Sequence, residues 1–172
     1  ADALRRDFTI NALSLDRAGR VHDYAGGLAD LAAGRVRFIG DPAQRIREDY
    51  LRILRFFRFH ARYGDGPLDR AGMTAAIALR EGLDSLSRER VRAEVLKLLV
   101  ARGAAATLTE ADGAGFLLRL FGGPARVRRM MALAAHERDV PDPVLRLGAL
   151  AVEILEDVAR LRARLRLSNG EQ

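Results

Sequence analysis

Two acids and three arginines follow one another in the stretch EDYLRILRFFR, at Glu48, Asp49, Arg52, Arg55 and Arg58. In a helix, residues three apart lie on one side, so the arginines would span about 9 Å of the axis. An ordinary helical ion pair, worth a few tenths of a kcal/mol, accounts for the first arginine with the acid three residues before it. The other two arginines then lack acidic partners nearby, and a bound polyphosphate would neutralise them.

Asp49 and Arg52 could also recognise a base. Cytosine and adenine both present an exocyclic amine beside an unprotonated ring nitrogen, whereas uracil and guanine present a carbonyl beside a ring N–H. A carboxylate accepts from the amine and a guanidinium donates to the ring nitrogen. The pair therefore predicts selection of C and A against U and G.

The helix that must position these groups is predicted to begin at Pro42, after a capping Asp41, and to end near Gly64. Its apolar residues Tyr50, Ile53, Leu54, Phe57 and Ala61 fall within one arc. The arginine side is interleaved with Leu51, Phe56 and Phe59. A solvated face would not need these bulky side chains, so we expect this side to pack against another segment as well.

Composition sets broader bounds. The 172 residues carry a formal charge of +6, and Lys97 is the one lysine among 29 basic residues. A basic surface attracts phosphates, although a genome that favours arginine codons would give the same composition. Zero cysteines exclude disulfides and thiolate metal sites, and the sequence contains neither a signal-peptide pattern nor an apolar run long enough for a membrane span. We expect a cytoplasmic protein without a membrane segment.

The predicted fold class is α+β and predominantly α. The stretches NALSL and RVHDY flank a turn at 16–19 and predict a hairpin, followed by a short helix ending at Gly34 and an extended piece at 36–39. Further helices are predicted at 68–79, at 83–103 with Ser85 or Ser87 as cap, and near 104–120, 124–137, 142–159 and 160–167.

Four motifs occur in order: RRDFTINAL (5–13), DYAGG (23–27), IGDPAQRIREDYLRILRFFRF (39–59) and RVRAE (90–94). Together they resemble the class II tRNA nucleotidyltransferases, which include the CCA-adding enzymes and the bacterial poly(A) polymerases. The resemblance covers about the first 100 residues. It implies that 1–41 ends a nucleotidyltransferase head, that 42–103 is a nucleotide-selecting helical neck, and that 104–172 is part of a helical, RNA-binding body.

The resemblance also implies roles for individual residues. Arg6 would contact the phosphates of an incoming nucleotide and Asp7 its ribose, with Asn11 in support. Without the resemblance, Arg6 would be part of a basic loop and Asp7 a helix cap. These readings are compatible, because a helix start also binds anions.

The second motif, Asp23, Gly26 and Gly27, matches a flexible spring between head and neck. An acidic turn with two permissive glycines explains it equally well.

In the third motif, Glu48, Asp49 and Arg52 match the nucleotide-selecting template of the family, which accepts CTP and then ATP. Arg55 and Arg58 match the arginines that follow it toward the phosphates. This agrees with the hydrogen-bonding argument from the bases.

In the fourth motif, Arg90 and Glu94 match a pair that braces the template helix. An exposed helical ion pair between the two, worth under about 1 kcal/mol, is the alternative.

Nucleotidyl transfer needs metal ions to activate the primer hydroxyl and to neutralise the leaving pyrophosphate. The resemblance implies Mg²⁺ held by paired acids upstream of Ala1, so we expect residues 1–172 alone to be inactive, as part of a longer chain. Glu137 and Asp139 are also two acids separated by one residue, but no glycine-rich strand precedes them, and we expect them to be solvated. His22, His60 and His136 are scattered.

Arginines also cluster near the C-terminal end. Arg126, Arg128 and Arg129 could follow an RNA backbone. For the series Arg160, Arg162, Arg164 and Arg166 we favour a solvated helix surface, since a spacing of two places successive side chains on opposite sides.

The predicted function is thus part of an enzyme that adds CCA to the 3′ end of tRNA from CTP and ATP. Alternatives are a bacterial poly(A) polymerase, an enzyme that adds only CC or only A, and a non-catalytic helical RNA-binding module.

Overall fold

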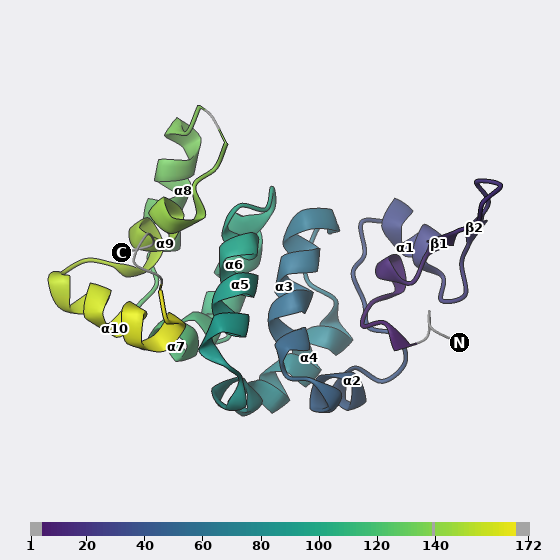
Figure 1. The fold of residues 1–172 in the computed structure, drawn as a ribbon, viewed down its shortest axis with the longest axis horizontal. Helices are drawn as coiled ribbons and strands as arrows, with labels where there is room; N and C mark the ends of the chain where they lie inside the picture. Colours follow the sequence, from purple (N-terminus) through teal and green to yellow (C-terminus); the bar gives the residue numbers. More distant parts are fainter. Residues whose placement is uncertain (1–4, 139, 168–172) are drawn as a thin grey trace.

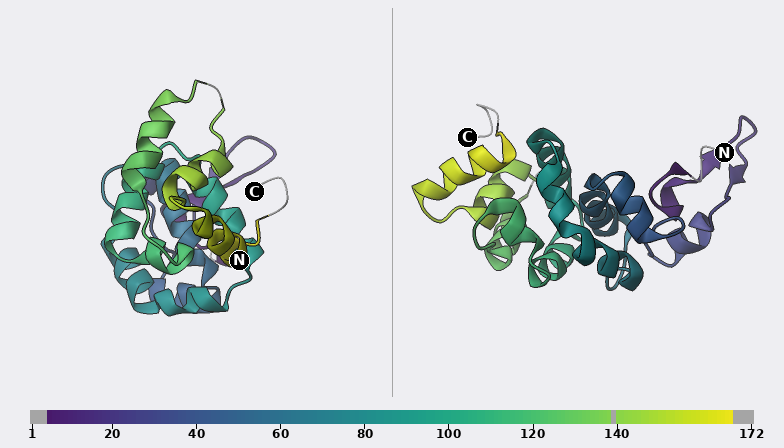
Figure 2. Two further views of the ribbon diagram at one scale, coloured as in Figure 1. Left: turned by 90° about the vertical axis from the view of Figure 1, so that its left-hand side faces the viewer. Right: turned by 90° about the horizontal axis from the view of Figure 1, so that it is seen from below.

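The computed structural model describes residues 5–138 and 140–167. The molecule is elongated: the hairpin of β1 and β2 lies at one end, and α8, α9 and α10 lie at the other (Figures 1 and 2). In the described ranges no helix is long and apolar enough to cross a membrane.

The N-terminal end is held by short elements. A 3₁₀ turn at Thr9–Asn11 precedes strands β1 (Ser14–Leu15) and β2 (Val21–His22), which pair antiparallel. The Asp16 carboxylate accepts hydrogen bonds from the backbone N–H groups of Ala18 and Arg20, and Gly19 has φ +77°. The predicted hairpin is confirmed.

Helix α1 (Gly27–Ala32) ends before Gly34, as expected. The extended segment after it returns to the start of the chain, where Phe8 and Phe38 form an antiparallel bridge. The backbone N–H of Thr9 donates to Arg37, and that of Ile39 donates to Asp7. Residues 5–11 are thereby attached to the segment that leads into the helical part.

The predicted single helix from Pro42 to Gly64 is wrong. Asp41 does cap its start, accepting from the Gln44 N–H at 2.6 Å, but the helix breaks into α2 (Pro42–Glu48) and α3 (Leu51–Tyr63). Asp49 has extended backbone geometry (φ −158°, ψ 109°) at the break. The apolar repeat continues through the break, so periodicity alone does not reveal it.

The next elements are α4 (Arg70–Leu79), a 3₁₀ segment η3 (Arg80–Ser85) and α5 (Arg88–Leu99). Ser87 occupies the N-cap position of α5 but makes no capping bond with its side chain. The turn before α5 places Gly82 against Tyr50, where an added Cβ would come within 2.0 Å of the ring. This glycine therefore permits the close approach of η3 to the α2–α3 break.

The remaining helices are α6 (Ala104–Gly113), α7 (Phe116–Phe121), α8 (Val127–His136), α9 (Pro143–Ala151) and α10 (Leu155–Leu165). The predicted helix at 104–120 is wrong because Gly115 is left-handed (φ +80°) and separates α6 from α7. The predicted boundary at 159–160 is also wrong: the chain breaks at 152–154, and α10 runs through 160.

Aromatic side chains connect the N-terminal segment to the helical core. Phe56 is fully buried and its ring lies 5.4 Å from that of Phe38, while Phe59 lies 5.0 Å from Phe8. On the opposite side, Phe57 packs edge-on against Phe116 of α7. The arginine side of α3 thus packs against another segment, as predicted, and the predominantly α fold class is confirmed. The three predicted domains stay a prediction.

Candidate nucleotide-binding site

Helix α3 lies between two other parts of the molecule, the N-terminal segment with α1 on one side and α5 on the other (Figure 1). Its arginines point to acids contributed by both neighbours and by α2. Three ion pairs result, and they determine the geometry of the site.

The first ion pair joins Arg52 to Glu48. The same Nη1 of Arg52 also donates to the backbone carbonyl of Arg45 at 2.8 Å, and the Arg45 guanidinium lies 3.2 Å from the Glu48 carboxylate. Hydrogen bonds from Arg52 and then from Arg45 lower the pKa of Glu48 below its ordinary value. The orientation of Arg52 is therefore fixed from α2.

Asp49 has a different partner. Its Oδ2 accepts from Nη2 of Arg90 at 2.6 Å, and its Oδ1 accepts from the backbone N–H of Leu51 at 3.1 Å. The backbone N–H of Arg52 donates to the Asp49 carbonyl, so the two residues lie on one turn. Their side chains are neighbours, but each is oriented by a third residue, and the simple pair between them is not formed.

The second ion pair crosses from α3 to the start of the chain. Nε of Arg55 donates to Oδ2 of Asp7 at 2.5 Å, and Nδ2 of Asn11 donates to Oδ1 at 2.6 Å. Asp7 is only 5% exposed. Burial raises the pKa of Asp7, but the bonds from Arg55 and Asn11 together outweigh burial, and the pKa lies below its ordinary value.

The third ion pair crosses from α3 to α5. Nε of Arg58 donates to Oε2 of Glu94 at 2.5 Å, and both side chains are largely buried, at 14% and 7% exposed. The Arg58 guanidinium also lies 4.6 Å from the centre of the Phe59 ring, a cation–π contact. The expectation that Arg55 and Arg58 lack acidic partners is wrong, because those partners come from distant segments.

Arg90 and Glu94 both point from α5 toward the α2–α3 region. Arg90 binds Asp49, and Glu94 binds Arg58. The alternative in which the two pair with each other as an exposed helical ion pair does not describe this arrangement. Contacts of this kind hold α3 in place from one side, while Asp7 holds it from the other.

The remaining predicted residues lie near α1. Arg6 is exposed beside the buried Asp7. The Asp23 carboxylate accepts from the backbone N–H groups of Leu28, Gly27 and Ala25, and these bonds lower its pKa, that from Leu28 most.

The two glycines of the same motif serve this turn. Gly26 is left-handed (φ +76°), and a Cβ on Gly27 would lie 2.2 Å from the Thr9 carbonyl oxygen. The acidic-turn interpretation accounts for these contacts, and the role of a spring stays a prediction.

Sequence reasoning missed a buried polar cluster beneath this turn. Asp30 is 4% exposed and accepts from Oγ1 of Thr9 and from Nε of Arg37, both at 2.6 Å. Thr9 and Asp30 are 21 residues apart, so no local spacing signals their contact. The cluster fixes the 3₁₀ turn that follows Asp7.

The described residues do not fit a catalytic metal centre: within 5–138 and 140–167 no group of three or more His, Cys, Asp or Glu side chains could hold an ion. Glu137 binds Arg146 at 2.6 Å and is 12% exposed, so the expectation that it is solvated is wrong. Asp139 lies outside the described residues.

The arginine clusters beyond α7 are largely engaged. Arg126 binds Glu153, and Arg129 donates to the carbonyls of Ala149 and Val152. Arg160 and Arg164 share one face of α10, four residues apart, and both donate to carbonyls at α7. The favoured interpretation of a solvated surface is therefore wrong for the half-buried Arg160, whereas Arg164 is exposed as expected.

Comparison with known proteins gives consistent matches. The family described as "Poly A polymerase head domain" matches residues 1–37. The mitochondrial CCA tRNA nucleotidyltransferase 1 of Mus musculus is 37% identical over 99% of this chain and 40% of its own length. The CCA-adding enzyme of Streptococcus sanguinis (strain SK36) is 41% identical over 80% of this chain and 35% of its own length.

A solved structure agrees with the sequence matches. The crystal structure of the Bacillus stearothermophilus CCA-adding enzyme in complex with CTP superposes with a TM-score of 0.77 at 28% identity. The alignment covers 98% of this chain and 43% of that one. The chain therefore spans less than half the length of each of these three relatives, and the family resemblance read from its motifs is confirmed.

Proposed function

Since this chain is a relative of the CCA-adding tRNA nucleotidyltransferases over nearly its whole length, we propose that it is the nucleotide-selecting part of such an enzyme. Asp49 and Arg52 act as the template for cytosine and adenine. Arg6, Asp7, Asn11, Arg55 and Arg58 form the wall on which the ribose and phosphates of the nucleotide lie.

The observation that carries this proposal is the hydrogen-bonding capacity left on Asp49 and Arg52. The described bonds of Arg52 use Nη1, and its Nε and Nη2 remain as donors. A carboxylate has about four lone-pair sites, and Asp49 uses two of them. Both side chains keep some exposure, at 34% and 17%. One acceptor and one donor are thus held side by side by Arg90 and Glu48.

The reaction proposed is transfer of CMP and then AMP to the 3′ end of tRNA, with CTP and ATP as substrates. A divalent metal, which we propose to be Mg²⁺, activates the primer hydroxyl and neutralises the pyrophosphate when bound. Its ligands would lie outside this chain, since the described residues do not fit a metal centre. This chain's own part is to bind and orient the nucleotide.

We propose the tRNA 3′ end as the macromolecular partner, in line with the names of the relatives. We also propose the cytoplasm as the compartment, in line with the bacterial CCA-adding enzymes among the relatives.

The test is Asp49→Ala in the full-length enzyme. We expect relaxed choice among the four nucleoside triphosphates, because the acceptor for the exocyclic amine is lost while the phosphate wall remains. Incorporation of each nucleotide into tRNA lacking CCA measures this. Glu156→Gln, an exposed acid of α10, is the matched control and should keep wild-type selectivity. Unchanged discrimination by the Asp49 variant would refute the template.

A poly(A) polymerase is the second candidate, because the matched head-domain family bears that description. Wild-type enzyme that incorporates ATP repeatedly and refuses CTP would favour it. An enzyme that adds only CC or only A would show the corresponding single preference. A non-catalytic RNA-binding module would bind tRNA and incorporate neither nucleotide.

A further inference from the structure

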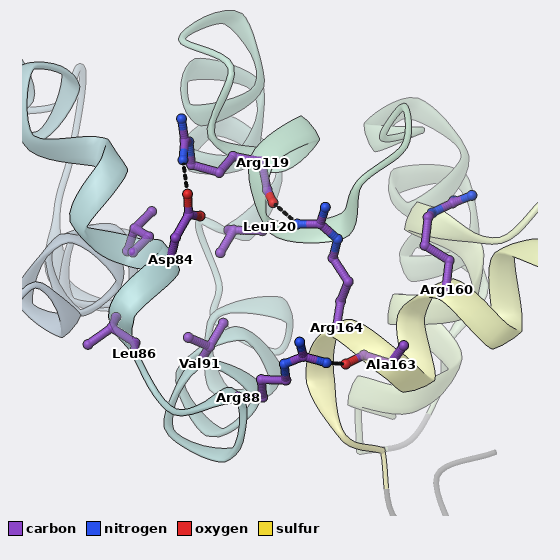
Figure 3. Close-up of a pocket in the computed structure, with 10 residues that line it drawn as sticks. Asp84, Leu86, Arg88, Val91, Arg119, Leu120, Arg160, Ala163 and Arg164 are labelled. Atoms are coloured by element: carbon purple, nitrogen blue, oxygen red, sulfur yellow. Dashed lines mark hydrogen bonds and ion pairs between the residues drawn. The ribbon is translucent and has the colours of Figure 1, made fainter.

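A cavity of about 530 Å³ lies between α5, α7 and α10, away from the arginine side of α3. Arg88, Arg119, Arg160 and Arg164 line it, with Asp84 as its acid (Figure 3). An adjoining cavity of about 450 Å³ shares Asp84, Arg119 and Arg164 and adds Arg80. We call this region, defined by the five arginines and Asp84, the arginine basin.

Most basin arginines are held by neutral backbone groups. Arg88 donates to the carbonyl of Ala163, and Arg164 donates to that of Arg119 (Figure 3). Each of these bonds uses one of the five N–H groups of a guanidinium. The arginines are thus oriented without losing their charge, and donors remain for a ligand.

The acids of the basin compensate only part of this charge. Asp84 binds Arg119, and its side chain is 62% exposed. Asp157, a buried residue in the first turn of α10, binds Arg160 at 2.5 Å, and Glu81 lies 4.0 Å from Arg119. Among the described residues, Arg80, Arg88 and Arg164 have no carboxylate partner, and each donates to a backbone carbonyl. The basin therefore carries net positive charge.

Two glycines make room for the arginines of α10. A Cβ on Gly122 would lie 2.7 Å from Nε of Arg164, and one on Gly123 would lie 2.5 Å from Nη2 of Arg160. Gly122 is also left-handed (φ +69°) and ends α7. The guanidinium groups can therefore lie directly against the backbone, which restricts their rotamers before any ligand binds.

We propose that the arginine basin binds phosphate groups, as a site separate from the nucleotide-selecting residues of α3. Planar guanidinium forks match phosphate oxygens in bidentate geometry. The phosphates belong either to an RNA backbone or to a free polyphosphate, and both offer the same oxygens. Helix α5 presents Arg88 to the basin and Arg90 and Glu94 toward α3, so one helix separates the two sites.

The test is calorimetric titration of the full chain with sodium tripolyphosphate and, separately, with a short RNA hairpin carrying a single-stranded 3′ extension. The variant is Arg88→Gln with Arg164→Gln. The matched control is Arg128→Gln with Arg162→Gln, which removes the same charge from exposed positions outside the basin. We expect the basin variant to bind about tenfold more weakly and to lose about two units of the salt slope of binding.

The two ligands show whether the bound phosphates belong to an RNA backbone or to a free polyphosphate. Weaker RNA binding with tripolyphosphate binding unchanged from the control assigns the site to a polynucleotide, and the reverse assigns it to a small anion. Either result, or weakening of both, supports the proposal. Equal binding by the basin variant and the control for both ligands would overturn it.

Asp84→Asn is a second variant, for which the proposal predicts a gain of ligand affinity that a misfolded protein would not show. Removing this acid leaves Arg119 with only the longer contact to Glu81, at 4.0 Å, and raises the positive charge, so we expect affinity for the responding ligand to rise about threefold. An unfolded variant could not bind more tightly, and unchanged or weaker binding would contradict the proposal. The template is tested by the nucleotide selectivity of the Asp49 variant and the basin by ligand titration of the Arg88 and Arg164 variant, so failure of the template and failure of the basin are separable.

Discussion

Two arginine-rich regions of this molecule are held in different ways. On α3, Arg52, Arg55 and Arg58 each meet a carboxylate, from α2, from the N-terminal segment and from α5. In the arginine basin, Arg88 and Arg164 meet carbonyl oxygens. An arginine paired with a carboxylate is held in a fixed orientation but attracts anions only weakly. An arginine held by neutral carbonyl groups keeps its attraction for anions. The first arrangement suits selection and the second suits affinity.

The largest expected effect comes from breaking a buried pair of the first region. Glu94→Gln leaves Arg58 buried without a counter-charge and should lower the free energy of unfolding by about 3 kcal/mol. The same change of acid to amide at the exposed Asp84 should cost under about 1 kcal/mol. Urea unfolding of both variants measures the difference. Equal losses of the free energy of unfolding in the two variants would show that the acid paired with α3 is no more important for stability than the exposed acid of the basin.

Asp7→Asn should have an intermediate effect on the free energy of unfolding, with a size that depends on pH. Its contacts with Arg55 and Asn11 lower the pKa of Asp7, so the unfolded state takes up a proton more readily than the folded state. We expect a loss of about 2 kcal/mol at pH 7. Wild-type stability due to Asp7 is present above about pH 4 and is lost as the pH falls through the folded pKa.

The gap between wild type and this variant should therefore narrow between pH 7 and pH 3. Thermal or urea unfolding at the two pH values measures it. A gap of the same size at both would contradict an ionised Asp7 as the source of the stability.

The smallest effect is expected in the second region. Gly123→Ala displaces the far end of the Arg160 side chain, at a cost of under about 1 kcal/mol. Binding of whichever ligand responds to the basin variant, RNA or tripolyphosphate, should weaken by about threefold, because the displaced guanidinium no longer lines the basin. Gly113→Ala is the control, since its added Cβ meets nothing within 4 Å. Identical affinities of the two variants for that ligand would show that Arg160 does not contribute to the basin.

Local signals in the sequence were sufficient for elements whose causes are local. Asp41 and Pro42 predict the start of α2, and the turn at 16–19 predicts the hairpin, because in each case neighbouring side chains and backbone decide the geometry. The break at Asp49 and the left-handed Gly115 were missed. At both positions the helical repeat of apolar residues continues on either side, so periodicity does not indicate the break.

The same holds for the candidate site: features with local causes could be predicted from the sequence, and features that depend on distant segments could not. Its residue types and the neighbouring positions of Asp49 and Arg52 follow from spacing, whereas their partners Arg90 and Glu48 were not predicted. The partners of Arg55 and Arg58 do not follow from spacing either, because Asp7 is 48 residues from the first and Glu94 is 36 residues from the second. Pairing over such distances depends on how three segments pack. The arginines of α3 look unpaired in the linear sequence, but in the folded chain Arg52, Arg55 and Arg58 each meet a carboxylate.

The burial of Phe8 has a consequence for how related chains should be interpreted. Its ring has no exposed surface and contacts Phe38, while the adjacent Asp7 turns its carboxylate to Arg55. Loss of the phenyl ring would open the interior, whatever the protein binds. Asp7 stabilises the fold through Arg55 as well, so retention of either residue in a related chain reports an intact interior and does not by itself report a shared binding site.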